Sequence, residues 1–214
     1  MTLRIALCDT DSRALAAWNA QFSEVPDVEI REESILETDA DVILLPGNSF
    51  GYLESGLALE ATEKFGMELQ DTIRSRIGGE FGGELLVGQA IDVALPEPKC
   101  LLVYAPVWRV PESLADSVNV FLAVRATFLT LDKQASEASI STLAIPALGL
   151  DPGGMHPYVS ARQIRYAYEI FCLHTRGASD KNLTRLRRRE RKLKSVPSQA
   201  FATGESPTAD EETQ

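Results

Sequence analysis

Short apolar runs alternate with amphipathic segments along the chain, and this alternation is the strongest constraint on the fold. Residues 4–8, 42–45 and 142–146 are apolar runs with the length and β-branched content of buried strands. Between such runs, segments such as 13–22 carry apolar side chains at helical spacing. Strands that alternate with helices form a layered α/β domain with a largely parallel central sheet. We therefore predict such a domain over residues 1–175.

The same patterns predict the other elements of this domain. A glycine-rich joint, residues 78–83, is expected to separate a pair of helices from the strands that follow. Proline at position 157 suits the first turn of the last helix of the domain. The further predicted elements are strands at 28–30, 85–93 and 100–105 and helices at 57–65, 68–77, 117–131 and 157–173.

Charge divides the chain into three parts. Residues 1–175 carry 25 acidic and 12 basic side chains, whereas residues 176–194 carry nine basic and two acidic ones. Residues 195–214 are rich in Ser, Thr, Pro and Glu and contain four acids and no base. Such a segment cannot bury enough apolar surface to offset its ordering entropy. We predict a basic helical extension over 176–194 and a disordered acidic tail over 195–214.

The basic segment has two interpretations. It would bind a nucleic acid or an acidic partner through phosphate or carboxylate contacts, or it would be a solvated helix that lies against the acidic domain. It has no interleaved aromatic side chains to stack on bases. Its charge alone leaves both interpretations open.

Composition excludes several classes of protein. No stretch approaches the roughly 20 unbroken apolar residues of a membrane span, and the first residues lack the pattern of a secretory signal. Three widely spaced cysteines (Cys8, Cys100 and Cys172) and two histidines do not suit a disulfide framework or a zinc site. We expect a soluble, cytoplasmic protein with no metal centre and no cofactor.

Two loops that follow predicted strands have the composition of a ligand site. Residues 46–56 and 149–155 are rich in glycine, which lets the backbone approach a phosphate closely. In α/β sheets, ligands bind at the carboxyl ends of the strands. Neither loop matches the P-loop or the dinucleotide-binding fingerprint. Glycine content alone leaves tight turns and a phosphate cradle open.

The order of the two loops is more specific. A strand followed by Pro-Gly-Asn-Ser at 46–49, and later a strand followed by Pro-Ala-Leu-Gly at 146–149 and Gly-Gly-Met at 153–155, resembles the macro domain family. The likeness runs from residue 34 to about 168, and residues 156–164 continue as in bacterial members. The resemblance implies a three-layer α/β/α sandwich with a mixed, largely parallel sheet. It also implies binding of ADP-ribose, free or attached to protein, nucleic acid or a metabolite.

The resemblance assigns roles in the first loop. Asn48 would hydrogen-bond the distal ribose, while Gly47, Ser49 and Gly51 would shape the loop around it. Gly56 would let the following helix approach closely.

In the second loop, the backbone N–H groups of Gly149, Gly153 and Gly154 would bind the diphosphate, aided by the dipole of the helix after Pro157. Three side chains would either form apolar walls of the pocket or pack in the core: Phe50, Tyr52 and Met155. Arg109 would either offset phosphate charge or be an ordinary surface arginine.

The chain departs from the family pattern at the acids. Many members contact adenine with an Asp, and Ser34, followed by Ile35, stands at that place; a serine accepts a weaker hydrogen bond than a carboxylate. Ala58 occupies the position where several hydrolase branches carry an acid that orients water. Glu54, in the loop, is the better replacement for that acid, and Glu60 is expected on the helix surface.

The second loop contains a further departure, Asp151 followed by Pro152. A carboxylate that faced a diphosphate would repel it, and proline removes one N–H donor. The loop remains competent if Asp151 points to solvent, and affinity is low if it points inward.

The function predicted from these observations is binding of ADP-ribose or a related nucleotide diphosphate, free or on a carrier. One alternative is an ADP-ribosyl hydrolase in which Asn48 and Glu54 position substrate and water. Another is a scaffold that has kept the fold and lost the ligand. No catalytic triad, nucleophile elbow or Mg²⁺ site is predicted, because helix capping explains Asp9 and Asp11 more simply.

Overall fold

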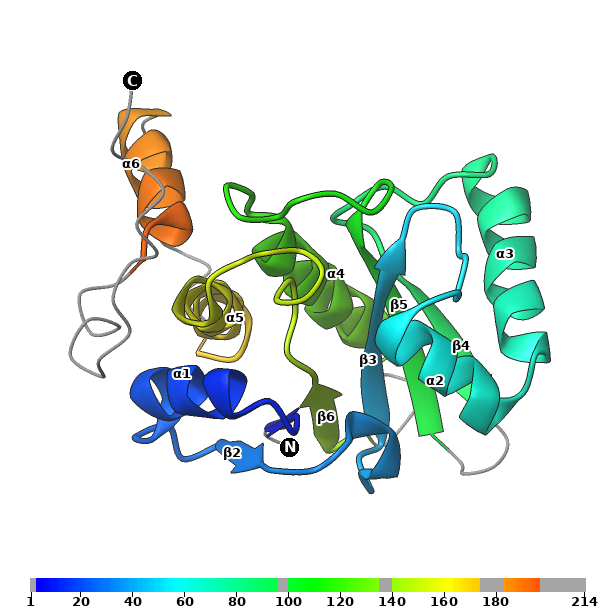
Figure 1. Ribbon diagram of the computed structural model, residues 1–214, viewed down its shortest axis with the longest axis horizontal. Coiled ribbons are helices and arrows are strands. Elements are labelled where there is room, and N and C mark those ends of the chain that lie inside the picture. The colour runs from blue at the N-terminus through cyan, green and yellow to red at the C-terminus, as the bar shows by residue number, and fades with distance from the viewer. Residues whose placement is uncertain (1–2, 96–99, 135–139, 174–182, 197–214) are drawn as a thin grey trace.

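In the part of the chain that the computed structural model describes, residues 3–95, 100–134, 140–173 and 183–196, six strands form one sheet in the order β2-β1-β6-β3-β5-β4 (Figure 1). The strands are β1 (Arg4–Cys8), β2 (Val28–Arg31), β3 (Val42–Asn48), β4 (Ile91–Leu95), β5 (Cys100–Trp108) and β6 (Thr142–Ile145). Neighbouring strands are parallel, except that β4 pairs antiparallel with β5. The predicted α/β class with a mixed, largely parallel sheet is confirmed.

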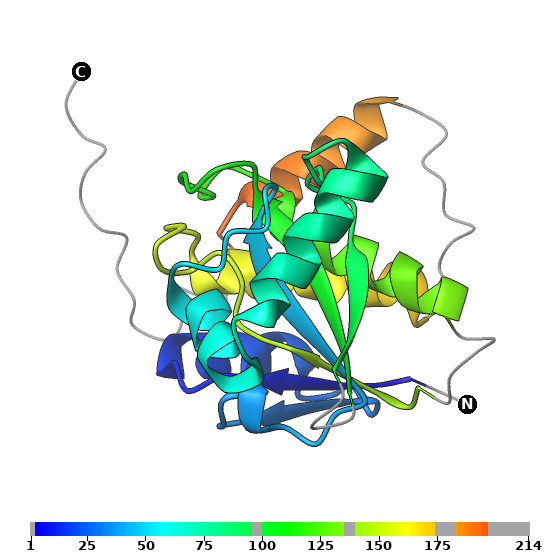
Figure 2. The ribbon, with the colours of Figure 1, turned by 90° about the vertical axis from the view of Figure 1, so that its right-hand side faces the viewer.

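Helices cover both faces of the sheet and complete three layers (Figures 1 and 2). One face carries α1 (Ser12–Phe22), α4 (Asn119–Gln134) and α5 (Pro157–Phe171), and the other carries α2 (Gly56–Phe65), α3 (Glu68–Phe81) and the short 3-10 helix η1 (Ile35–Glu37). Side chains alternate between two cores, as β1 shows: Ile5 and Leu7 pack under α1, whereas Ala6 and Cys8 face the opposite layer. The predicted three-layer sandwich is therefore confirmed.

The unbroken apolar run at 42–45 forms the buried part of the central strand β3. Val42, Ile43, Leu44 and Leu45 are each at most 1% exposed, because helices cover both faces of a parallel sheet. Burying side chains of this size contributes roughly 2 kcal/mol each relative to leaving them exposed. Beyond this run, the last three residues of β3, Pro46, Gly47 and Asn48, line a cavity.

Two predicted boundaries were wrong. The predicted joint at 78–83 is helical as far as Phe81, since the burial of Leu69, Ile73 and Ile77 along α3 outweighs the cost of about 1 kcal/mol for each internal glycine. The predicted strand at 85–93 begins only at Ile91, because residues 85–90 form a loop that turns at Gly88 with a φ of 96°.

A sixth helix, α6 (Leu183–Lys194), lies beside α5 at the edge of the molecule (Figure 1). It covers the second part of the predicted basic extension. Residues 174–182, where the boundary of the main domain is predicted, lie outside the described residues, as does most of the predicted tail (197–214). In the ranges that are described, no helix has the length and hydropathy that a membrane span requires.

Candidate functional site

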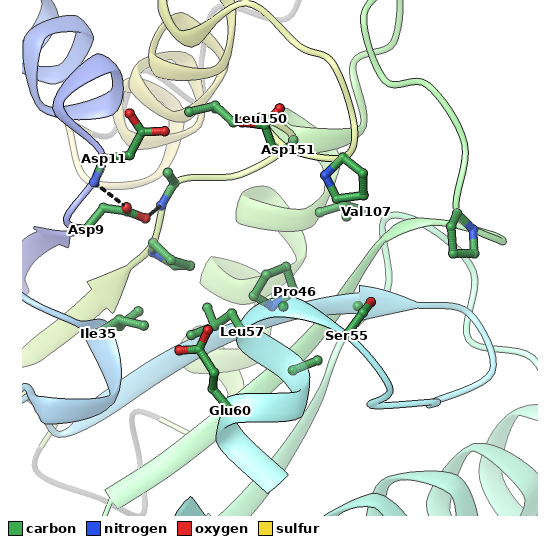
Figure 3. A pocket seen from close by; sticks show the side chains of 18 of the residues that line it. Asp9, Asp11, Ile35, Pro46, Ser55, Leu57, Glu60, Val107, Leu150 and Asp151 are labelled. Carbon is green, nitrogen blue, oxygen red and sulfur yellow. Dashed lines mark hydrogen bonds between the residues drawn. The ribbon is translucent and has the colours of Figure 1, made fainter. Parts of the chain in front are cut away.

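A cavity of about 430 Å³ lies where the carboxyl ends of β1, β3, β5 and β6 meet (Figure 3). Its walls come from the strand ends, from the loops that follow them, from η1 and from the first turns of α2. The lining from the strand ends and the following loops includes Cys8, Asp9, Thr10, Asp11, Pro46, Gly47, Asn48, Val107, Trp108, Pro146 and Ala147. This volume lies in the range of small-molecule sites, and the position is the one where α/β sheets bind ligands.

Asn48 holds the first loop in shape. Its side-chain Oδ1 accepts hydrogen bonds from the N–H groups of Phe50 and Tyr52 at 3.0 and 3.3 Å, and its Nδ2 donates to the Tyr52 carbonyl at 2.7 Å. Beneath it, the buried Tyr104 hydroxyl donates to the Asn48 carbonyl at 2.6 Å, and burial raises the pKa of this phenol. A Cβ on Gly47 would lie 2.2 Å from the Tyr104 hydroxyl, so only glycine fits there.

Of the other predicted residues of this loop, one lines the cavity and two are buried. Gly56, at the start of α2, lines the cavity with a φ of 53°. Ser49 and Gly51 are buried and do not line it. A Cβ on Gly51 would lie 2.9 Å from Ile73, which shows how closely the loop packs on α3. The Ser49 hydroxyl is buried without a hydrogen-bond partner in the described part of the chain.

The second loop is held mainly by its own backbone. The Gly154 N–H donates to the Leu150 carbonyl at 2.5 Å, and the Met155 N–H donates to the Gly149 carbonyl at 2.8 Å. A Cβ on Gly153 would lie 2.7 Å from the Gly149 carbonyl oxygen. Of these five residues, Gly149 and Leu150 line the cavity. Gly153, Gly154 and Met155 do not, and Met155 packs in the core beneath α1, α4 and α5.

Three backbone donors in the part of this loop that lines the cavity have no acceptor among the described residues. They are the N–H groups of Gly149, Leu150 and Asp151. The Asp151 side chain is 74% exposed and pairs with Arg13 of α1 at 2.5 Å. The Asp151 carboxylate therefore points to solvent and not into the cavity.

The segment after β1 is a third wall that the sequence analysis did not assign to the site. Asp9 joins two strand ends: its Oδ1 accepts from the Asp11 N–H at 2.9 Å and its Oδ2 from the Ala147 N–H at 3.1 Å (Figure 3). Asp11 caps α1 and accepts two further hydrogen bonds from the Arg13 guanidinium, at 3.1 and 2.6 Å. These bonds hold the pKa of the Asp11 carboxyl below its usual range. The rule that singled out the two glycine loops, a loop at the carboxyl end of a strand, would also have found this one.

Apolar side chains and a carboxylate that has no partner among the described residues also line the cavity. Ser34, Ile35 and Leu57 line it, and Figure 3 shows Glu60 of α2 beside Leu57 and Ile35. The Ser34 hydroxyl accepts from the Leu36 N–H at 3.3 Å, because Ser34 caps η1.

Two acids of this stretch differ in their relation to the cavity. Glu60 is exposed on α2, as expected, and also lines the cavity together with Ala58, whereas Glu54 is exposed and does not line it. The lining residues include four acids, Asp9, Asp11, Glu60 and Asp151, but no Lys or Arg. A bound anion would therefore be held by backbone dipoles rather than by a paired cation.

Arginines at the surface near the cavity are engaged by neighbouring side chains. Arg109 pairs with Glu84 at 2.6 Å and lies 5.1 Å from the ring centroid of Phe50, so it has the surface role that was one of its two interpretations. Arg74 lies 4.3 Å from the ring centroid of Tyr52, which lines the cavity and is 41% exposed. Both contacts are cation–π pairs that stiffen the outer side of the first loop.

The described side chains do not favour nucleophilic catalysis or metal binding. Cys8 lies at the cavity wall, but burial raises the pKa of its thiol to about 11, so the reactive thiolate is scarce near neutral pH. In the portion of the chain that is described, no group of three or more His, Cys, Asp or Glu side chains could hold a metal ion.

Comparison by sequence finds little. No family model matches the chain. An uncharacterized protein of Aquifex aeolicus is 28% identical over 137 residues, which covers 64% of this chain and 77% of that protein.

Comparison by structure finds macrodomains. The chain is similar to the macrodomain of Mycobacterium tuberculosis DarG, with 17% identity, a TM-score of 0.54, and coverage of 65% of this chain and 88% of that one. The Oceanobacillus iheyensis macrodomain with ADP gives 16% identity, a TM-score of 0.56, and coverage of 66% and 74%. Thermosipho africanus DarTG in complex with ADP-ribose gives 16% identity, a TM-score of 0.53, and coverage of 64% and 37%. The chain has the macrodomain fold, as its two loops implied.

Proposed function

We propose that this chain, which has the macrodomain fold, binds ADP-ribose or a related nucleotide diphosphate, free or attached to a carrier. The observation that carries the proposal is the cavity of about 430 Å³ between the two glycine-containing loops, at the carboxyl ends of the strands. Two structures with the same fold contain ADP and ADP-ribose. The proposal extends that ligand chemistry to the present cavity.

The chemistry of the walls suits the parts of such a ligand. Ile35 and Leu57 provide an apolar surface for the adenine ring. The N–H groups of Leu150 and Asp151 are donors for the diphosphate, and Asn48 lies at the other end for the distal ribose. Because the Asp151 carboxylate pairs with Arg13, its repulsion of the diphosphate is reduced.

The absence of a Lys or Arg among the lining residues limits the expected affinity for ADP-ribose. Without a charged clamp on the diphosphate, we expect micromolar affinity, equivalent to roughly 8 kcal/mol of binding free energy.

Calorimetric titration of the whole chain with ADP-ribose tests the proposal. Asn48→Ala removes the side chain that shapes the first loop and faces the ribose, and we expect it to weaken binding on the order of tenfold. Asn19→Ala is the matched control, because Asn19 is exposed on α1 and its side chain bonds the Leu15 carbonyl and no other group in the described part of the chain. Absence of heat at millimolar ADP-ribose, or equal weakening by both variants, would overturn the proposal.

We expect binding without hydrolysis. Hydrolase chemistry needs an acid that orients water at the distal ribose, yet Ala58 stands at the position implied for that acid and Glu54 does not line the cavity. Glu60 lines it beside Ile35 and Leu57, the surface proposed for adenine rather than for the distal ribose. Incubation with ADP-ribosylated protein and nucleic acid, followed by detection of free ADP-ribose, separates the two functions. Release of ADP-ribose that Asn48→Ala abolishes would establish the hydrolase instead.

A further inference from the structure

The helix α6 is docked on the domain along one face. Leu193 is 6% exposed, and its carbonyl accepts from Nε2 of the fully buried Gln163 at 3.3 Å. Arg162 of α5 donates to the carbonyls of Lys192 and Ser195 at 2.7 and 2.8 Å, which satisfies backbone acceptors at the end of α6. The position of the helix is therefore determined by specific contacts.

A second contact orients the middle of the helix. The Arg189 guanidinium donates to the Tyr166 hydroxyl and lies 5.1 Å from the centroid of its ring. Arg189 thus faces the domain, in the same direction as Leu193. The side chains on the opposite face of α6 are left toward solvent.

The side of α6 that is exposed to solvent carries most of the remaining positive charge. Its members, which we call the cationic face, are Arg185, Arg187, Arg188, Arg191 and Lys192. At 3.6 residues per turn they occupy an arc of about 160° and extend over about 10 Å of the helix axis. All five are exposed, and none forms an ion pair with a carboxylate in the described part of the chain. The acid of this helix, Glu190, pairs with Lys194 at 2.9 Å.

We propose that the cationic face binds the phosphate backbone of double-stranded nucleic acid. Four of its five cations are arginines, whose planar guanidinium binds phosphate oxygens in pairs. A duplex presents a negative charge about every 1.7 Å along its axis, so several phosphates lie within the span of the face. The cationic face includes no aromatic side chain for base stacking, which favours a duplex over a single strand.

The packing of α6 argues against a membrane partner. A helix that lies in a lipid interface inserts a continuous apolar face. Of the three leucines of α6, Leu193 is buried against the domain, and the two exposed ones, Leu183 and Leu186, are too few to form such a face. The net charge of −10 does not prevent local attraction of an anion, because charges more than about 10 Å apart are screened at 0.1 M salt. This inference does not rest on the ligand of the cavity.

The test is fluorescence anisotropy of labelled 20-base-pair duplexes of two unrelated sequences, titrated with the whole chain at 50 to 200 mM salt. We expect equal affinity for both sequences and a steep loss with salt, about 0.9 in the logarithmic slope for each phosphate contact. Arg188→Gln/Arg191→Gln should reduce that slope by about 2 and weaken binding on the order of tenfold. Arg4→Gln/Lys133→Gln changes the net charge equally at exposed positions elsewhere and should leave binding unchanged.

Several results would overturn the inference. They are no binding at 50 mM salt, equal loss in both double variants, or tighter binding of a single strand of the same length. Displacement of the duplex by polyglutamate at equal charge concentration would indicate an acidic protein partner. Binding of vesicles with anionic lipid in place of the duplex would indicate a membrane surface. Thermal unfolding of each variant shows whether a loss of binding reflects a loss of fold.

Discussion

The two glycine-containing loops beside the cavity are held in shape by different means. In residues 46–56 one side chain, Asn48, makes three hydrogen bonds within the loop. In residues 149–155 the bonds run from backbone to backbone, and Arg13 of α1 pairs with Asp151 from outside the loop. Residues far away in the sequence contact both loops, Tyr104 the first and Arg13 the second. The difference is that a side chain within the first loop fixes its shape, whereas backbone hydrogen bonds fix the shape of the second.

The largest expected effect is in the first loop. In Gly47→Ala the new methyl group would overlap the Tyr104 ring, which is fully buried and cannot move without breaking its hydrogen bond to the Asn48 carbonyl. We expect a loss of about 3 kcal/mol in the free energy of unfolding, measured by urea denaturation.

Gly78→Ala is the control for this substitution. The position lies inside α3 with open space around it, so alanine should stabilise the protein by up to about 1 kcal/mol. If Gly47→Ala unfolds like the wild-type protein, the space beneath the first loop does not determine its shape.

A smaller loss is expected from Gly153→Ala in the second loop. The added Cβ would lie 2.7 Å from the Gly149 carbonyl oxygen and 3.0 Å from Leu114, so the loop must shift. We expect about 2 kcal/mol of destabilisation and weaker ADP-ribose binding.

The neighbouring Gly154→Ala provides the comparison. Its φ is 68°, but its Cβ would lie 4.0 Å from the nearest atom, so only the backbone cost of about 1 kcal/mol applies. Equal losses for the two variants would show that close packing within the second loop contributes nothing.

The smallest effect concerns the link between α1 and the second loop. Arg13→Gln removes ion pairs whose members are partly exposed, so we expect a loss below about 1 kcal/mol at pH 7. The pKa of Asp11 is lowered in the folded state, so the stability from this pair is present above the unfolded pKa and is lost as the pH falls through the folded one.

The difference between Arg13→Gln and wild-type should therefore shrink below about pH 4, measured by thermal unfolding at pH 7 and pH 3. Lys133→Gln, at an exposed position near the end of α4, is the control and should show no such pH dependence. A difference that stays constant into acid would contradict the assignment to Asp11.

The elements that the sequence predicted well are those with an unbroken apolar run. Residues 42–45 and 142–146 could be recognised because a strand covered on both faces needs apolar side chains at every position. The prediction of a joint at residues 78–83 was wrong because the local cost of glycine in a helix is smaller than the gain from burying Ile73 and Ile77. No local sequence pattern shows that gain.

The candidate site was only half predictable. The glycine loops could be found from composition and order, but Glu60 and Glu54 are two acids in one short stretch, and only the packing of α2 decides which of them lines the cavity. The sequence predicts Asp9 as a capping residue and Arg13 as the first residue of a helix, although the two side chains reach Ala147 and Asp151. Both contacts join residues that are more than a hundred positions apart, so no local sequence pattern predicts them.

The sequence by itself determined the layered α/β class, the order of its strands and helices, and the two glycine-containing loops that border the cavity, because these follow from periodicity and from the conformational freedom of glycine. The tertiary structure alone decided which side chains face the cavity, where the Asp151 carboxylate points, and which face of α6 meets solvent. Those outcomes depend on how separate elements pack against one another, and packing joins residues that no local pattern connects.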